Sequence, residues 1–158
     1  MNFDLVYQSP PVGLLASQAD AAGRTGPYKS LRNVSGLIVL VCRVNQGSTA
    51  QVTFTPLQAQ DSSGTGSKAI PVVPIFYNAD TTVSDTLVAQ AAAASFQTDA
   101  TLKDKYVAFK FEAGNLDLAN GFNHIAIQTS VSNAANITSA EMFAIGRFQG
   151  ATPMASEV

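Results

Sequence analysis

The sequence predicts an all-β fold, an antiparallel β-sandwich with an extended N-terminal arm. Apolar residues recur at every second position in several short segments, which is typical of half-buried strands. Turn-forming residues separate these segments at short intervals, as in antiparallel sandwiches. The chain has 158 residues, close to the usual size of one domain, so we expect a single core.

The residue pattern of residues 1–35 differs from that of the rest of the chain. Residues 1–35 are predicted to form an extended arm and entry segment, and residues 36–158 the sandwich domain. Apolar side chains alternate as in an edge strand until Pro10-Pro11 ends it, and the glycines that follow disfavour a helix. Such a segment has no obvious way to bury itself alone, so we expect it to lie across the domain or a neighbour. The candidate protein-contact residues are Phe3, Leu5, Tyr7, Pro10, Pro11 and Leu14.

The middle of the chain begins with a continuous apolar run, Leu37–Val44, which predicts a central strand buried on both faces. In the next strand the alternation changes parity at Pro56, which predicts a bulge or bend there. Residues 61–67 form a loop by composition. Because Pro71 and Pro74 interrupt the apolar residues 70–77, we expect edge strands in this stretch.

The second half contains one ambiguous stretch and several clear strands. Leu87–Ala94 includes four consecutive alanines but has no amphipathic stripe, so it is expected to be irregular, with at most one helical turn. The remaining pattern predicts strands at 106–112, 123–129 and 141–148, with a turn at 115–121.

The composition favours a protein that packs against other proteins. The chain is 46% hydrophobic and only 13% charged, so its surface is largely neutral and polar. Neutral polar groups cost less to dehydrate than ions, which favours a permanently packed protein over a neutral monomer. The net charge is −2 and the cations are scattered, which argues against a nucleic-acid partner.

The single cysteine, Cys42, excludes an intrachain disulfide and is expected to be a buried structural thiol. The N-terminus has no basic region followed by an apolar run, so we expect synthesis in the cytoplasm. Since no apolar segment approaches the roughly 20 residues that span a bilayer, no membrane partner is expected.

No arrangement of residues points to catalysis, and we expect neither an enzyme nor a cofactor or metal. His124 is the only histidine, and it is expected to be a hydrogen-bonded strand residue. The acids Asp80, Asp85, Asp99 and Asp104 match no EF-hand spacing. The glycines of residues 64–68 lack the Walker spacing of a phosphate-binding loop.

Several segments together resemble a family of small structural proteins from tailed bacteriophages. The segments are Tyr28–Leu31, Gln58–Asp61, Tyr106–Phe111, Leu116–Phe122, Ser132–Ala140 and Arg147-Phe148. The resemblance covers most of the chain, and it implies a head decoration or cement protein with a jelly-roll-like β-sandwich. Proteins of this family bind the outer surface of an assembled shell at capsomer junctions.

The resemblance therefore implies the major capsid protein as partner, a homo-oligomer (trimer or dimer), and a location on the capsid surface after synthesis in the host cytoplasm. The family has no catalytic residues to transfer. We expect the arm to make intersubunit or capsid contacts through edge-strand hydrogen bonds.

Three other hypotheses remain open at this stage. The nearest is another virion component, such as a minor capsid subunit, a head–tail connector or a fibre protein. The second is a carbohydrate-binding module, although the chain has no Trp and only four Tyr for sugar stacking. The third is a hydrolase built around His124, for which no nucleophile or paired base is visible.

Overall fold

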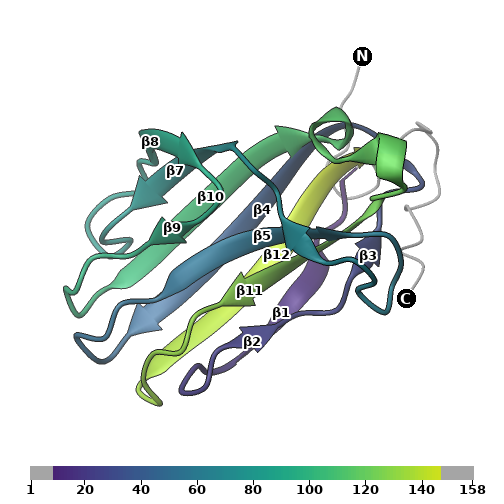
Figure 1. Cartoon of the computed structure of the whole chain (residues 1–158). Helices are drawn as coiled ribbons and strands as arrows, with labels where there is room; N and C mark the ends of the chain where they lie inside the picture. Colours follow the sequence, from purple (N-terminus) through teal and green to yellow (C-terminus); the bar gives the residue numbers. More distant parts are fainter. Residues whose placement is uncertain (1–8, 147–158) are drawn as a thin grey trace.

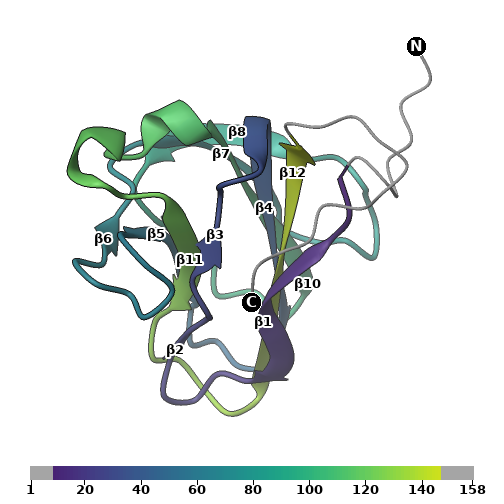
Figure 2. The ribbon, with the colours of Figure 1, turned by 90° about the vertical axis from the view of Figure 1, so that its right-hand side faces the viewer.

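The structure is a computed structural model that describes residues 9–146. Two antiparallel sheets face each other as two layers, which confirms the predicted β-sandwich (Figures 1 and 2). The first, which we call the long sheet, has the strand order β1-β12-β4-β10-β7-β8. Its strands are β1 (Val12–Ala19), β4 (Val34–Gln46), β7 (Val73–Asn78), β8 (Val88–Ala93), β10 (Asp104–Glu112) and β12 (Asn136–Gly146).

The second sheet, which we call the short sheet, has the order β2-β11-β5-β6, with β3 also paired to β11 and β9 to β5. Its strands are β2 (Arg24–Thr25), β3 (Lys29–Ser30), β5 (Thr53–Ala59), β6 (Lys68–Ala69), β9 (Phe96–Gln97) and β11 (His124–Thr129). Two short 3-10 turns, η1 (Ala113–Asn115) and η2 (Leu118–Asn120), connect β10 to β11. The chain crosses repeatedly between the sheets, as is typical of jelly-roll sandwiches.

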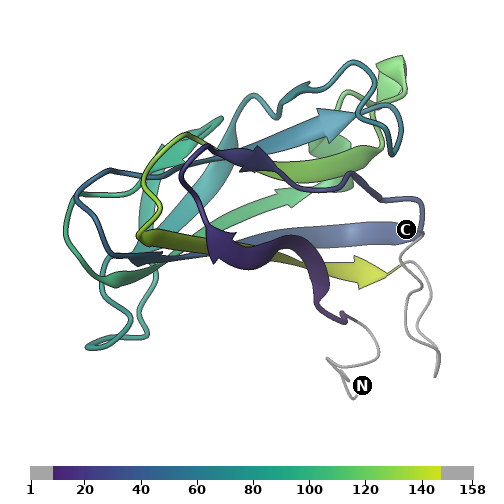
Figure 3. The ribbon, with the colours of Figure 1, turned by 90° about the horizontal axis from the view of Figure 1, so that it is seen from below.

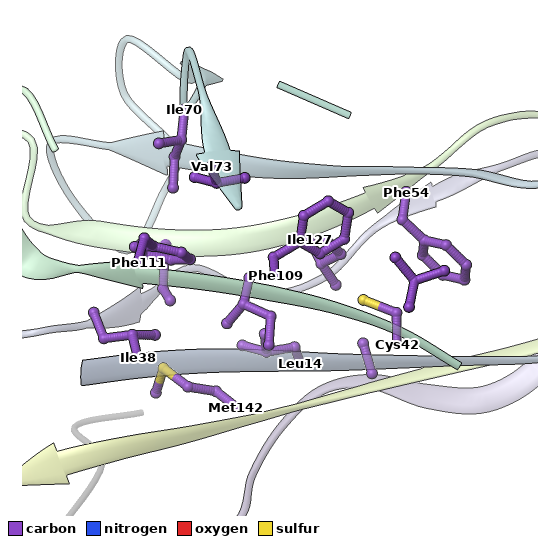
Figure 4. Close-up of a cluster of buried hydrophobic side chains, with 14 of the residues drawn as sticks. Leu14, Ile38, Cys42, Phe54, Ile70, Val73, Phe109, Phe111, Ile127 and Met142 are labelled. Atoms are coloured by element: carbon purple, nitrogen blue, oxygen red, sulfur yellow. The ribbon is translucent and has the colours of Figure 1, made fainter. Parts of the chain in front are cut away.

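The core lies between the sheets and is built from inward-facing residues of both (Figure 4). On β4 the even-numbered residues from Ile38 to Val44 are fully buried. Phe109 of β10 pairs with Leu40, and both point inward. The short sheet contributes Phe54 and Ile127, which are also fully buried. Complete burial of a large apolar side chain stabilises the fold by about 1.5–3 kcal/mol, so this layer dominates the stability.

From Val12 onward, the structure differs from the prediction of an arm over residues 1–35. β1 pairs with β12 at one edge of the long sheet (Figure 3), and Leu14 is only 1% exposed in the core. The register shifts twice along β1, so Leu14 and Leu15 are both buried although they are adjacent. This break in alternation is the physical reason why the sequence pattern did not indicate a core strand.

The structure around Pro56 and Pro74 also differs from the prediction. Pro56 pairs with Ile127 in an unbroken register, so the predicted bulge at this position is wrong. Its carbonyl accepts a hydrogen bond from the Ile70 amide (3.0 Å), and it falls between the short partners β9 and β6, where no ladder bond needs its missing N–H. The irregularity occurs instead at Pro74, between Val73 and Ile75 of β7. Because β7 lies between β10 and β8, the prediction of an edge strand in this stretch is wrong.

The remaining strand predictions are largely confirmed. β4 is a central strand, β10 covers the predicted segment 106–112, and β11 covers residues 124–129 of the predicted segment 123–129. β12 begins five residues earlier than expected, and residues 147–148 of the predicted last strand lie outside the described residues. Residues 115–121 lie in the connection that holds η1 and η2. The prediction of an irregular segment at Leu87–Ala94 is wrong, because Val88–Ala93 forms the edge strand β8.

Candidate protein-binding face

The outer face of the long sheet is unusually apolar. On β4 the odd-numbered residues Leu37, Val39 and Val41 point away from the core and are partly exposed. An antiparallel sheet commonly has one core face and one polar, solvated face. The predicted two-sided apolar character of β4 is therefore present, and within residues 9–146 the other layer, the short sheet, lies on the opposite side (Figure 2).

The strands on either side of β4 extend this apolar surface. Phe143 of β12 lies opposite Val39, and Ala108 of β10 lies opposite Val41. Phe76 of β7 lies opposite Ala108, so Val41, Ala108 and Phe76 form one row across three strands. We call the following set the outer apolar band: Leu37, Val39, Val41, Phe76, Ala108, Phe143 and Ile145. Its members come from four adjacent strands and share the outer face, where Ala108 is almost completely buried between Val41 and Phe76.

Charged residues lie beside the outer apolar band, at the ends of the cross-strand rows that contain Val41 and Val39. Glu141 ends the row of Val41, and Lys110 ends the row of Val39. Arg43 lies one row further along, where its guanidinium is 3.3 Å from an Asp104 carboxylate oxygen and 5.8 Å from the Tyr106 ring centre. An apolar centre with a charged, solvent-accessible rim is the usual anatomy of a protein–protein interface.

Two shallow pockets flank the band. One, of about 420 Å³, is lined by Ser17, Arg43, Asn45, Ile137 and Ser139. The other, of about 380 Å³, is lined by Pro74, Phe76, Lys110, Phe111, Glu112 and Asn115. Both mix apolar walls with polar groups, so they offer recesses in which side chains of a partner protein can be seated.

The β8 edge, residues 88–93, is a second feature of this sheet. β8 is the last strand of the long sheet, and among the described strands only β7 pairs with it. Residues 86–98 contain no charged residue. Val88, Ala89, Ala91 and Ala92 are exposed, so both faces of the strand are open to solvent. An uncharged, open edge presents free backbone donors and acceptors to another strand.

An ion pair between a buried lysine and a partly exposed aspartate links β10 to the segment that follows β9. The Lys105 ammonium is completely buried and donates to Asp99 Oδ1 (2.8 Å), the Asp99 carbonyl (2.7 Å) and Gln46 Oε1 (3.0 Å). Burial opposes ionisation of Asp99, but hydrogen bonds from Lys105, Thr101 and Tyr77 outweigh it and hold the pKa of Asp99 well below its ordinary value. All three ammonium protons of Lys105 therefore have acceptors, as expected of a structural cation.

The two residues considered for nucleophilic or acid–base chemistry lie in strands. Cys42 is fully buried in the core, and burial raises the pKa of its thiol. His124 is half-buried at the start of β11, with Nδ1 2.5 Å from Asn123 Oδ1. Within residues 9–146, no group of three or more His, Cys, Asp or Glu side chains is placed to hold a metal ion. In the same part of the chain, no helix is long and apolar enough to cross a membrane.

The predicted contact residues fall into three groups. Phe3, Leu5 and Tyr7 lie outside the described residues. Pro10 is partly exposed and Pro11 is exposed, both just before β1. Leu14 is a core residue and cannot contact a partner. Since β1 and β8 are the two opposite edges of the long sheet, the structure does not bring Pro10 and Pro11 to the β8 edge.

Sequence reasoning missed both the band and the edge. The signal for the band was present, because Leu37–Val44 is apolar at odd and even positions alike. The strands that complete the band come from distant parts of the chain, so their shared face could only be recognised with the sheet order. For the edge, the uncharged stretch 86–98 was the available signal.

Comparison with known proteins gives a fold relationship alone. No family model matches the chain, and no curated protein matches it. Among solved structures, the chain is similar to the SPBc2 prophage-derived protein YomS, with a TM-score of 0.50 and 9% sequence identity. The match covers 90% of this chain and 98% of YomS. The two proteins thus share a β-sandwich fold over nearly their whole lengths.

Proposed function

We propose that this protein is a non-enzymatic structural protein of a bacteriophage particle that binds the outer surface of the capsid and stabilises it. The observation that carries the proposal is the outer apolar band on the long sheet. Apolar area buried against a partner yields roughly 25 cal/mol per Å², and the charged residues at its margin confer specificity. The fold shared with a prophage-derived protein supports a phage origin.

In this proposal the partner is the major capsid protein, and the contact is made by the outer face of the long sheet. An open apolar face with shallow pockets suits a partner that is itself a broad protein surface, whereas small ligands are held in deep concave sites. Many copies on one shell add avidity, so each contact can be individually modest.

Binding to purified capsids that lack the protein tests the proposal. The variant Val41→Lys places an ammonium group at the centre of the outer apolar band. Glu141 lies directly opposite on β12, so the new lysine gains a cross-strand partner and the fold tolerates it. We expect capsid binding to weaken by about tenfold or more, because a desolvated charge replaces an apolar contact.

The matched control is Leu118→Lys. Leu118 lies on η2, away from the outer face, and is 53% exposed. Co-sedimentation should show wild-type binding for this variant and loss for Val41→Lys, with equal melting temperatures for both. Equal binding of wild type and Val41→Lys would remove the outer apolar band from the proposal.

The predicted N-terminal contact is tested separately. Deleting residues 1–8 removes Phe3, Leu5 and Tyr7 and keeps every described strand. If the N-terminal residues contact the capsid or a neighbouring copy, the shortened protein binds shells more weakly than the full chain. Unchanged binding would leave the outer face as the contact surface.

A further inference from the structure

The two edges of the long sheet are protected to different degrees. Native proteins guard edge strands with charges, prolines or bulges. The β1 edge has two register irregularities, which distort its outer hydrogen-bonding row. β8 follows β7 regularly from Val88 to Gln90, with a single irregularity beyond Gln90, and contains neither a charge nor a proline. The regular part of β8 is therefore an open pairing site.

We propose that this site is occupied by β8 of a second copy of the chain, in an antiparallel pair related by a two-fold axis near Ala89. In such a pair Val88 of one copy lies opposite Gln90 of the other, and Ala89 lies opposite itself. No like charges meet, because residues 86–98 are uncharged, and the small side chains allow close approach. The strand is thus complementary to itself.

Exposed apolar residues next to the strand add contact area. Leu87 and Val88 are 44% and 57% exposed at the start of β8. With the two-fold axis near Ala89, Leu87 of one copy lies opposite Ala91 of the other, and Val88 lies opposite Gln90, so the partner strand covers both side chains. Their burial supplements the backbone hydrogen bonds.

The pairing joins two six-stranded sheets into one continuous sheet. The outer apolar bands of both copies then lie on the same side of that sheet, so the dimer presents a doubled binding face. The inference selects a dimer from the two oligomeric states, trimer and dimer, that the family resemblance implies. It concerns the isolated protein, and it can therefore fail or succeed independently of capsid binding.

Disulfide cross-linking of Ala89→Cys locates the pair. Directly opposed residues of antiparallel strands have Cα atoms about 4.5–5.5 Å apart, within the range that a disulfide spans. The native Cys42 is fully buried and does not compete. Mild oxidation of the full-length variant should give a covalent dimer. The control is Ala16→Cys, because Ala16 is exposed on β1, the opposite edge strand. This variant should remain monomeric on a non-reducing gel.

Size-exclusion chromatography with light scattering gives the stoichiometry. We expect a dimer that dissociates on dilution, and we expect Ala89→Lys to raise its dissociation constant by about tenfold or more, because two ammonium groups face each other at the axis. Ala16→Lys should leave the dimer unchanged. A monomer or trimer at all concentrations, or a dimer that Ala89→Cys does not cross-link, would overturn the inference. Equal melting temperatures of the variants confirm that the fold is intact.

Discussion

A single glycine allows the two layers of the sandwich to approach closely at one point. Gly26 is buried, its amide donates to the Ile127 carbonyl (3.0 Å), and a Cβ atom at this position would lie 2.0 Å from the Leu14 carbonyl oxygen. Glycine is required here because the backbone of β1 passes so close. The contact joins the edge strand of the long sheet to the short sheet.

Replacing Gly26 by alanine should therefore destabilise the protein. Overpacking of this kind costs about 1–3 kcal/mol, because the backbone of β1 must move away from the short sheet. Gly13→Ala is the control, since no heavy atom lies within 4 Å of a Cβ at that position. Chemical denaturation should show a lower midpoint for Gly26→Ala and a nearly unchanged one for Gly13→Ala.

Replacing Asp99 and replacing Lys105 should destabilise the protein to different extents. Asp99→Asn removes the carboxylate beside a fully buried ammonium, which should cost about 2 kcal/mol, because the remaining acceptors only partly compensate the charge. Lys105→Met leaves Asp99 with its bonds from Thr101 and Tyr77 and with access to water. We expect the methionine variant to be the more stable of the two in urea denaturation. The reverse order would show that Lys105 tolerates burial without its partner.

The same carboxylate links stability to pH. The folded protein holds the pKa of Asp99 below its ordinary value of 3.8, so its contribution is fully present above about pH 4 and is lost as the pH falls. Melting temperatures of wild type and Asp99→Asn should therefore differ at pH 7 and converge in acid. The comparison isolates Asp99, because Asp80, with a pKa of about 2 beside Lys103 and Thr82, titrates in both proteins. A constant difference down to pH 2 would contradict this assignment.

Whole strands were predictable where apolar residues alternate regularly. β10 and β11 follow such patterns, whereas β4 was predictable from its continuous apolar run, which did not by itself reveal the outer apolar band. β1 was not recognised as a core strand, because its irregular register buries adjacent residues. β8 is made mostly of alanine, which favours helices intrinsically, and only its pairing with β7 makes it a strand.

The role of β1 changes how the N-terminus should be truncated. The sequence alone predicts that a chain lacking residues 1–15 stays folded, whereas the structure predicts that it does not. This deletion removes half of β1 together with Leu14 and Leu15 from the core. We expect the chain lacking residues 1–8 to retain a cooperative thermal transition, and the chain lacking residues 1–15 to lose it or to melt far lower. Circular dichroism distinguishes the two outcomes.

Taken as a whole, the molecule combines a conventional core with a second apolar surface on the outer face of its long sheet. Burying that surface stabilises an assembly, and a surface with few charges makes the burial inexpensive. The position of the outer face depends on the order β1-β12-β4-β10-β7-β8, which combines strands from both ends of the chain. No local sequence pattern encodes this order, so the candidate site could only be located in three dimensions.

Electron cryo-microscopy of shells saturated with the purified protein tests the central claim most directly. The account predicts additional density on the outside of the capsid, into which the sandwich fits with the outer apolar band against the major capsid protein. Where two copies are adjacent, their β8 strands should meet at the two-fold axis. Density confined to the neck, tail or interior of the particle, or absent from the shell at saturating protein, would contradict the proposed function.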